Sequence, residues 1–148
     1  PRGAMIVYGS IIPYHGYRGP DGTSGQWVEH RRSIALHRRD WSKIRTGHPS
    51  SHFVVGGDFN QNRDGARWYG TNRNRKLLTE ALSQAKLVCV TEEDFVRSGK
   101  LSDRHTVDHI CLDERLAGSV SAVGAWERTN SDGQQLSDHS GVFVDVSL

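Results

Sequence analysis

Two polar residues follow a short apolar run near the middle of the chain. In the segment SHFVVGGDFNQNRDG (residues 51–65), the run Phe53–Val55 is followed by two glycines and then by Asp58, Phe59 and Asn60. Strand alternation places Asp58 and Asn60 on the same side, with Phe59 turned away, and glycines let backbone or ligand approach closely. The pattern predicts a buried strand that ends in a carboxylate and a carboxamide. The alternative is an ordinary polar turn, because Asp and Asn favour turns.

Two acid–histidine pairs occupy similar places further along. Asp108 and His109 interrupt the apolar segment TVDHICL, and Asp138 and His139 precede the last apolar segment in LSDHSGVFVDV. A lone buried carboxylate is costly unless a cation or donor pairs with it. Acids at three strand ends therefore indicate a shared partner, and a hard divalent cation such as Mg²⁺ fits because it takes one or two carboxylates plus substrate phosphate.

Each pair also has a simpler interpretation. Asp108 could pair with a structural arginine, and Asp138 with His139 could belong to an ordinary loop. We expect His109 to be structural and to pack under the sheet.

The apolar patterns predict alternating strands and helices. Trp27, Ile34 and Trp41 recur every seventh position and form one apolar helix face. Strands are expected over residues 5–12, 53–55, 87–91, 106–112, 120–126 and 141–148, and helices over residues 26–45 and 74–86. The order strand–helix–strand–helix followed by strands predicts an α/β fold, a mixed β-sheet covered on one face by two helices. In such sheets the chemistry gathers at strand ends.

Length and composition are those of one globular domain. The 148 residues are 35% hydrophobic and 24% charged, and the formal net charge of +2 is too small to indicate nucleic acid on its own. No apolar stretch is long enough to span a membrane. Cys89 and Cys111 lie in apolar runs without a CxxC motif, so we expect small buried hydrophobes rather than a zinc site, with a disulfide as the alternative.

A basic and aromatic segment, NRDGARWYGTNRNRK, follows Asn60 directly. Arginine binds phosphate in bidentate fashion and aromatic rings stack on bases. Arg63, Arg67 and Trp68 are therefore candidate substrate-binding residues for nucleic acid. The alternative is a solvated loop whose aromatic residues pack on the sheet.

Three motifs in order, GGDFNQ, VDHICL and LSDHS, resemble the later motifs of the endonuclease/exonuclease/phosphatase family, which has the deoxyribonuclease I-like fold. VYGSIIPYHG resembles the strand and loop that precede them. The resemblance implies a four-layer sandwich of two packed sheets flanked by helices. It also implies that the single domain over residues 1–148 lacks its N-terminal half, which carries an Asn and a metal-binding Glu. A missing upstream half, or a second copy in a homodimer, would then complete the sandwich, because a lone half leaves an apolar sheet face in water.

The resemblance implies metal-dependent hydrolysis of a phosphoester by in-line attack of an activated water, with Mg²⁺ or Mn²⁺ as the cofactor. The enzyme would be a nuclease, another phosphodiesterase or a phosphatase. Asp58 matches the acid that handles the proton of the water or leaving group and also contacts the metal. Asn60 matches the amide that orients that group and contacts phosphate. Asp138 matches a metal ligand.

The remaining implied roles belong to histidines and their partner. His139 would contact the phosphate or act as general base, and Asp108 would accept its other ring N–H and fix its tautomer. His15 matches loosely the His or Tyr that some members place after the preceding strand, and an exposed loop histidine is the alternative.

Two other function classes stay open at this point. The chain could be a catalytically inactive half-domain that acts by binding or assembly, because the Glu of the family pattern has no counterpart. It could also be an unrelated α/β binding domain whose motifs match by chance.

Overall fold

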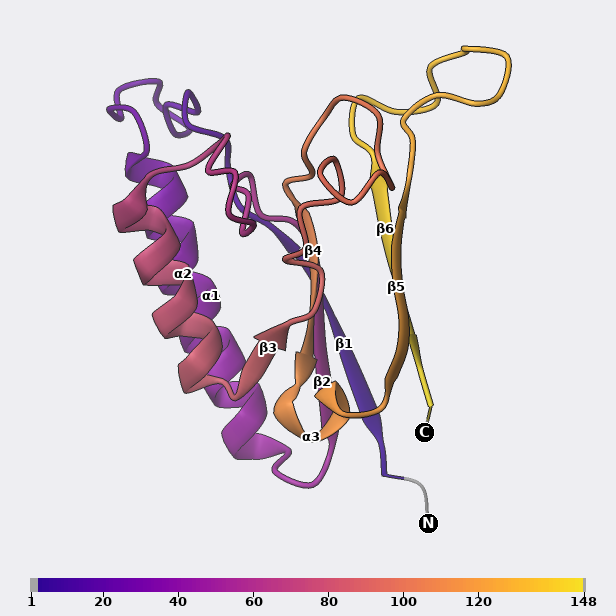
Figure 1. Cartoon of the computed structure of the whole chain (residues 1–148). Coiled ribbons are helices and arrows are strands. Elements are labelled where there is room, and N and C mark those ends of the chain that lie inside the picture. Colours follow the sequence, from indigo (N-terminus) through magenta and orange to yellow (C-terminus); the bar gives the residue numbers. More distant parts are fainter. Residues whose placement is uncertain (1–2, 148) are drawn as a thin grey trace.

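The computed structural model describes residues 3–147 and shows three layers (Figure 1). Helices α1 (Val28–Gly47) and α2 (Asn72–Gln84) form one outer layer. A four-stranded sheet in the order β1-β2-β4-β3 forms the middle, and a two-stranded sheet of β5 and β6 forms the other side. The predicted mixed sheet covered by two helices is confirmed. The last two strands form a sheet of their own, which alternation in sequence does not specify.

The main sheet is mixed because of how its strands connect. β1 (Met5–Ile11) and β2 (His52–Asp58) run parallel, since α1 carries the chain back between them. β4 (Asp108–Asp113) runs antiparallel to β2, and β3 (Leu87–Cys89) runs antiparallel to β4. A short helix, α3 (Glu114–Ala117), leads to β5 (Val120–Trp126), which pairs with β6 (Gly141–Val146). Leu148, with which we expected the last strand to end, lies outside the described residues.

Several boundaries differ from the sequence prediction for physical reasons. β2 continues through Gly56 and Gly57 to Asp58, because both glycines stay in register with β1 and β4. α2 begins two residues early, because the Thr71 hydroxyl caps it by accepting from the Asn74 N–H at 3.1 Å. It ends at Gln84, two residues earlier than predicted, and Lys86 just beyond the cap has a left-handed φ of 56°. α3 was not predicted.

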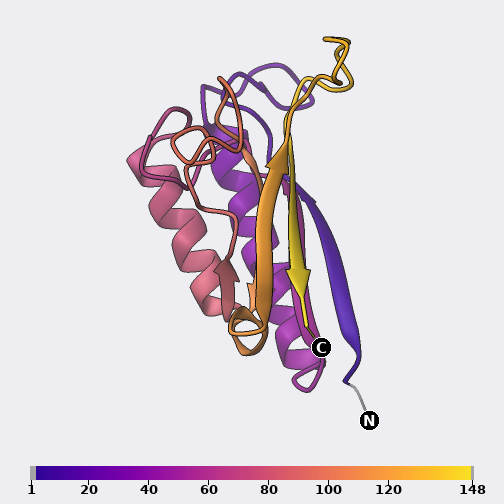
Figure 2. The same cartoon turned by 45° about the vertical axis from the view of Figure 1, so that its right-hand side comes forward.

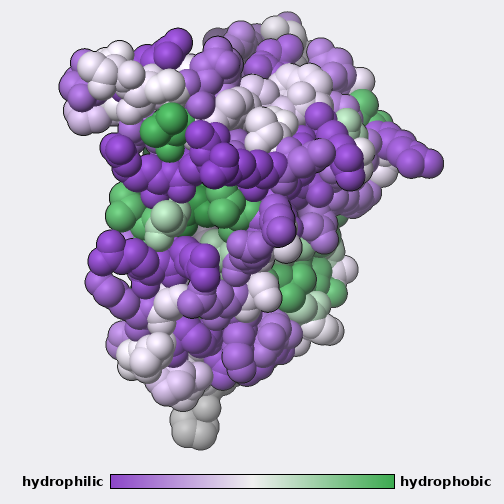
Figure 3. Space-filling view, turned by 90° about the vertical axis from the view of Figure 1, so that its left-hand side faces the viewer, coloured by the Kyte–Doolittle hydropathy of each residue, from purple (hydrophilic) through white to green (hydrophobic). Residues whose placement is uncertain are grey.

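The hydrophobic core lies between the helices and the main sheet. Trp41 of α1 and Leu78 of α2 are fully buried against Phe53 and Val55 of β2. The outward face of the helix layer is mostly hydrophilic with a smaller hydrophobic area (Figure 3).

Both cysteines are buried and free, as expected, and face each other across the β3–β4 pair. His109 is buried as well, and its ring nitrogens contact the backbone oxygens of Gln61 at 3.1 Å and Thr91 at 3.2 Å. No helix within residues 3–147 has the length and apolar character needed to cross a membrane.

The opposite face of β1 is open. Met5, Val7 and Ile11 point away from the helices and are 42%, 71% and 75% exposed. In Figure 2, β1 lies to one side of the β5–β6 pair, which does not cover it.

Candidate active site

The end of β2 presents the first two candidate residues. The Asp58 carboxylate accepts from the Asn60 backbone N–H at 2.8 Å and from the Asn60 side-chain amide at 2.6 Å. The same amide donates to the Ile12 carbonyl oxygen at 2.9 Å, beyond the end of β1. Asn60 has a φ of 46°, a left-handed conformation that Asn tolerates better than most residues. Phe59 between them is fully buried, so the two polar side chains share one side as predicted.

Sheet register brings the second carboxylate to the same place. Asp108, the first residue of β4, is directly opposite Asp58 across the antiparallel β2–β4 pair. Directly opposed residues of such a pair have neighbouring side chains. The end of one strand and the start of the next therefore place two carboxylates side by side.

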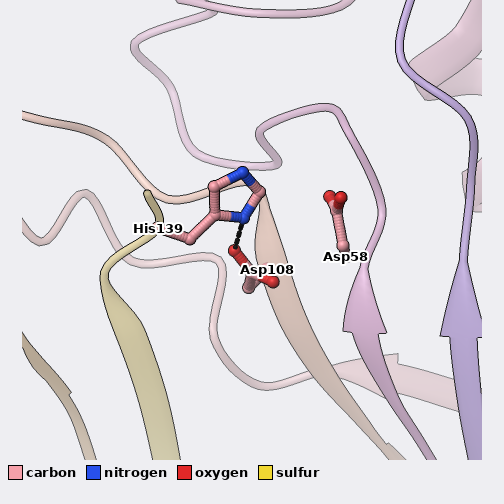
Figure 4. A group of neighbouring side chains, drawn as sticks. All are labelled: Asp58, Asp108 and His139. Carbon is pink, nitrogen blue, oxygen red and sulfur yellow. Dashed lines mark hydrogen bonds and ion pairs between the residues drawn. The ribbon is translucent and has the colours of Figure 1, made fainter. Parts of the chain in front are cut away.

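His139 reaches these carboxylates from the loop before β6. Its Nδ1 donates to Asp108 Oδ2 at 2.7 Å, across 31 positions of sequence (Figure 4). The His139 backbone N–H is held by the Ser137 hydroxyl at 3.1 Å. The hydrogen bond from Nδ1 to Asp108 fixes one tautomer of the ring and leaves Nε2 free for a substrate.

Asp58, Asp108 and His139 form one cluster, in which one potential ligand atom of each lies within 4.8 Å of the others. Burial raises the pKa of Asp58 above its ordinary value, and the Asp108 charge raises it further, while the hydrogen bond from the Asn60 backbone opposes the change. A cation or a proton would relieve the repulsion between the two carboxylates. Carboxylate oxygens are the ligands that Mg²⁺ and Mn²⁺ prefer, so the donor set fits such an ion.

Asp138 lies outside that cluster. Its side chain is exposed, and Ser137 Oγ is 3.5 Å from its Oδ1. Its backbone oxygen accepts from Arg104 at 3.1 Å. Asp138 is nevertheless close enough for its charge to contribute to the raised pKa of Asp58, after burial and other nearby groups.

His15 is also outside the cluster and is held by an aromatic group. Its Nδ1 lies 2.7 Å from the Tyr69 hydroxyl, and its ring packs near Trp27 with centroids 5.6 Å apart. It is half-buried rather than freely exposed. It ties the loop after β1 to the loop after β2.

The three candidate substrate-binding residues, Arg63, Arg67 and Trp68, have different surroundings. Arg63 turns toward α2 and β3, where it donates to the Thr79 hydroxyl at 3.0 Å and pairs with Glu92 at 3.6 Å. Arg67 is exposed. Trp68 is 49% exposed and lines a small cavity with Asp108 and His139.

A larger hollow of about 480 Å³ lies between the two sheets beside the cluster. Gly57, Asp108 and Ile110 line it from the main sheet, and Trp126 and His139 line it from the side of the second sheet. The cluster therefore lies at the edge of a space that a substrate can enter.

Sequence reasoning missed Arg104 and His105. The Arg104 guanidinium lies over the Trp68 ring at 5.8 Å, and both residues line the small cavity beside the cluster. The available signal was an arginine and a histidine just before the strand that carries Asp108.

Solved nuclease and phosphatase structures share the fold. The 3′-5′ exonuclease NExo from Neisseria meningitidis has a TM-score of 0.67 at 15% identity, and the match covers 97% of this chain and 62% of that one. A Neisseria NExo structure described as a 3′ phosphatase bound to a product DNA hairpin has a TM-score of 0.64 at 14% identity, covering 98% of this chain and 62% of that one. An AP endonuclease from Archaeoglobus fulgidus has a TM-score of 0.63 at 13% identity, covering 96% and 61%.

The chain thus spans a little over three fifths of the length of these structures. No curated protein matches it significantly. A family model described as endonuclease-reverse transcriptase (Exo_endo_phos_2) matches residues 27–143, which include the whole Asp58–Asp108–His139 cluster. The resemblance of the three motifs is confirmed: the chain belongs to the endonuclease/exonuclease/phosphatase family, whose structures have the deoxyribonuclease I-like fold.

Proposed function

We propose that the chain carries the active-site end of a divalent-metal-dependent phosphoester hydrolase that acts on nucleic acid. The observation that carries the proposal is the 2.7 Å contact between His139 and Asp108, directly beside Asp58. Family membership and the nuclease and phosphatase neighbours support phosphoester hydrolysis as the kind of reaction.

The roles proposed for the polar groups follow from their contacts. Asp108 holds His139 Nδ1, so Nε2 faces substrate and contacts the phosphate or takes a proton from the attacking water. Asp58, whose pKa burial raises, exchanges a proton with the water or the leaving group. Asn60 orients Asp58 through two hydrogen bonds, and its side-chain amide would contact phosphate by releasing the Ile12 carbonyl oxygen.

The proposed cofactor is Mg²⁺ or Mn²⁺, held by Asp58 with Asp138 as a second ligand. When bound, such an ion supplies charge neutralisation at the phosphoryl oxygens. Asp138 would reach the ion by turning its exposed side chain toward Asp58, whose pKa the Asp138 charge helps to raise.

Nucleic acid is the proposed substrate because neighbours of the same fold are an exonuclease, a phosphatase bound to DNA and an AP endonuclease. Trp68, with Arg104 over its ring, offers a stacking surface beside the catalytic pair. Arg67 is exposed and would bind phosphate. Arg63 and His15 would act by holding the loop on which Trp68 lies, through their contacts to Thr79 and Tyr69.

We further propose that this single domain is completed by more strands, from an N-terminal half or from a second copy of the chain. The open apolar face of β1 supports this arrangement. The same face favours a second candidate function, a catalytically inactive half-domain that acts by binding or assembly.

Cleavage by the full chain distinguishes these functions. Labelled single- and double-stranded DNA are incubated with the chain and Mg²⁺ or Mn²⁺, and EDTA should stop product formation. His139→Ala should lower the rate by roughly 100-fold or more, because general acid–base groups contribute about 10²–10⁴-fold. His48→Ala, at an exposed histidine that caps α1, is the matched control and should keep the rate.

Equal rates in wild type and His139→Ala would contradict the role of His139. Metal binding without turnover in any condition would favour the inactive half-domain.

A further inference from the structure

A second group of metal-ligating side chains lies outside the candidate active site. Asp64 comes from the loop after β2, and Asp94 and His105 come from the long connection between β3 and β4. One ligand atom of each lies within 4.8 Å of the others. His105 Nδ1 is 3.3 Å from Asp64 Oδ2 and 3.3 Å from Asp94 Oδ1.

Both carboxylates are held in place by other donors. Asp64 is buried, and its Oδ1 accepts from the Asn62 amide at 2.6 Å and from the Ala66 N–H at 2.9 Å. These contacts leave its Oδ2 directed at His105. Asp94 Oδ1 accepts from the Arg97 N–H at 3.0 Å. Such outer contacts are the ones that orient carboxylate ligands of metals.

Hydrogen bonding alone does not account for the arrangement. His105 Nδ1 is buried yet forms a hydrogen bond with neither carboxylate, although it is equally distant from both. Two ligands at about 2.1 Å from a tetrahedral zinc ion are separated by about 3.4 Å, close to these distances.

The charges of this group also favour a bound cation. Two carboxylates face at most one positive charge on the ring. Within residues 3–147, no lysine or arginine lies within ion-pair distance of Asp64 or Asp94. The nearby Arg75 donates instead to oxygens of Asn62 and Tyr69. An excess of negative charge at a partly buried place is stabilised by a cation.

We propose that Asp64, Asp94 and His105 form a second metal site, for a divalent transition metal of the Zn²⁺ type. One imidazole and two carboxylates suit Zn²⁺, whereas Mg²⁺ takes oxygen ligands. Three protein ligands leave a fourth position for water. The site is separate from the Asp58 cluster and does not depend on the proposed hydrolysis.

The site would join two loops that border the active site. His105 lines the same small cavity as Trp68, Arg104, Asp108 and His139. Arg104, its neighbour in sequence, holds the loop of His139 by donating to the Asp138 oxygen. A bound ion would therefore hold Trp68 and Arg104 in place beside His139.

Calorimetric titration of the full chain with Zn²⁺ tests the site, with excess Mg²⁺ present to occupy oxygen-only sites. Wild type should bind Zn²⁺ at a site that His105→Ala and Asp94→Asn each weaken by at least about 10-fold, the scale seen on loss of outer contacts of metal ligands. His48→Ala is the matched histidine control and should bind as wild type. His139→Ala should keep this site, which separates it from the Asp58 cluster.

Zn²⁺ should also raise the melting temperature of wild type more than that of His105→Ala, because ligands that bind the folded state stabilise it. If His105→Ala does not fold, the binding of Zn²⁺ by Asp94→Asn, whose side chain is 22% exposed, tests the site instead. Wild-type affinity and stoichiometry in both variants, or no Zn²⁺ binding by wild type, would overturn the proposal. Neither result bears on cleavage that depends on His139.

Discussion

Single carboxylates in this chain differ in pKa because their neighbours differ. The pKa of Asp58 is raised, since burial and the Asp108 charge both disfavour the ionised form. Burial acts in the same direction on Asp113, but hydrogen bonds from Arg115 and then Arg45 outweigh it, so its pKa is lowered. Proton exchange needs a group of the first kind, and structural ion pairs use the second.

Asp113→Asn should destabilise the fold. Asp113 is buried and accepts from Arg115 at 2.6 Å, and Arg45 lies 2.8 Å away. Losing one partner of a buried pair costs about 3–5 kcal/mol, and Asn keeps the helix cap of α3. Because the folded pKa is lowered, the contribution is complete above about pH 5 and is lost as pH falls toward the folded value. Urea unfolding at several pH values measures it.

The difference in unfolding free energy between wild type and Asp113→Asn should therefore shrink on acidification. Asp103→Asn is the control, because Asp103 is 64% exposed and pairs with Arg128 at 3.8 Å; its effect should stay below about 1 kcal/mol. A difference that is constant with pH would show that lost packing, not charge, destabilises Asp113→Asn.

The sequence predicted which residues gather at the candidate site better than it predicted which contacts their side chains make. Asp58, Asn60, Asp108 and His139, which were predicted from polar residues at the ends of apolar runs, lie together in the structure, and their catalytic roles stay predictions. Asp138 and His15 lie outside the cluster, since a motif gives an order along the chain and not the direction of a side chain. His105 was missed because its partners are 41 and 11 positions away and share no apolar pattern with it.

At the scale of elements, the pairing register of β1, β2 and β4 positions the residues of the candidate site. Asp58 is the partner of Ile11 on one side and Asp108 on the other. Gly57 makes the close approach possible: its φ is 143°, and a Cβ there would lie 2.0 Å from the Ser10 carbonyl oxygen. The apolar run Phe53–Val55 predicted only a three-residue strand, because glycines carry no apolar signal.

Gly57→Ala should destabilise the chain and displace Asp58. Strained backbone alone costs about 1–3 kcal/mol, and the contact with Ser10 adds to it. Gly9→Ala, one register step away on β1, is the matched control, since a Cβ there meets nothing within 4 Å. Thermal unfolding of both variants checks this, and equal stabilities would refute the role given to Gly57.

At the scale of the whole molecule, the helices cover one face of the main sheet and the β5–β6 pair covers part of the other. The fold class followed from the order of elements, because short crossovers limit how strands can pair. The separate β5–β6 sheet could not be predicted from the order of elements. Alternation shows which side chains of a strand share a face, but it does not show which strands pair with each other.

The open face of β1 should cause self-association. Val7 and Ile11 are 71% and 75% exposed, and contiguous apolar surface favours contact with other chains. The double variant Val7→Lys/Ile11→Lys should weaken concentration-dependent association in sedimentation. Leu36→Lys is the control, because Leu36 is 52% exposed on the helix layer. A wild type that stays monomeric at high concentration would contradict the prediction.

The contact between His139 and Asp108 joins residues 31 positions apart, and the Asn60–Ile12 contact joins residues 48 apart. Pairings over such separations form late, because the entropy of closing long loops must be lost before they contribute. A partly folded chain therefore lacks the contact between His139 and Asp108. Under the proposed function, cleavage would therefore report on completed folding of the chain.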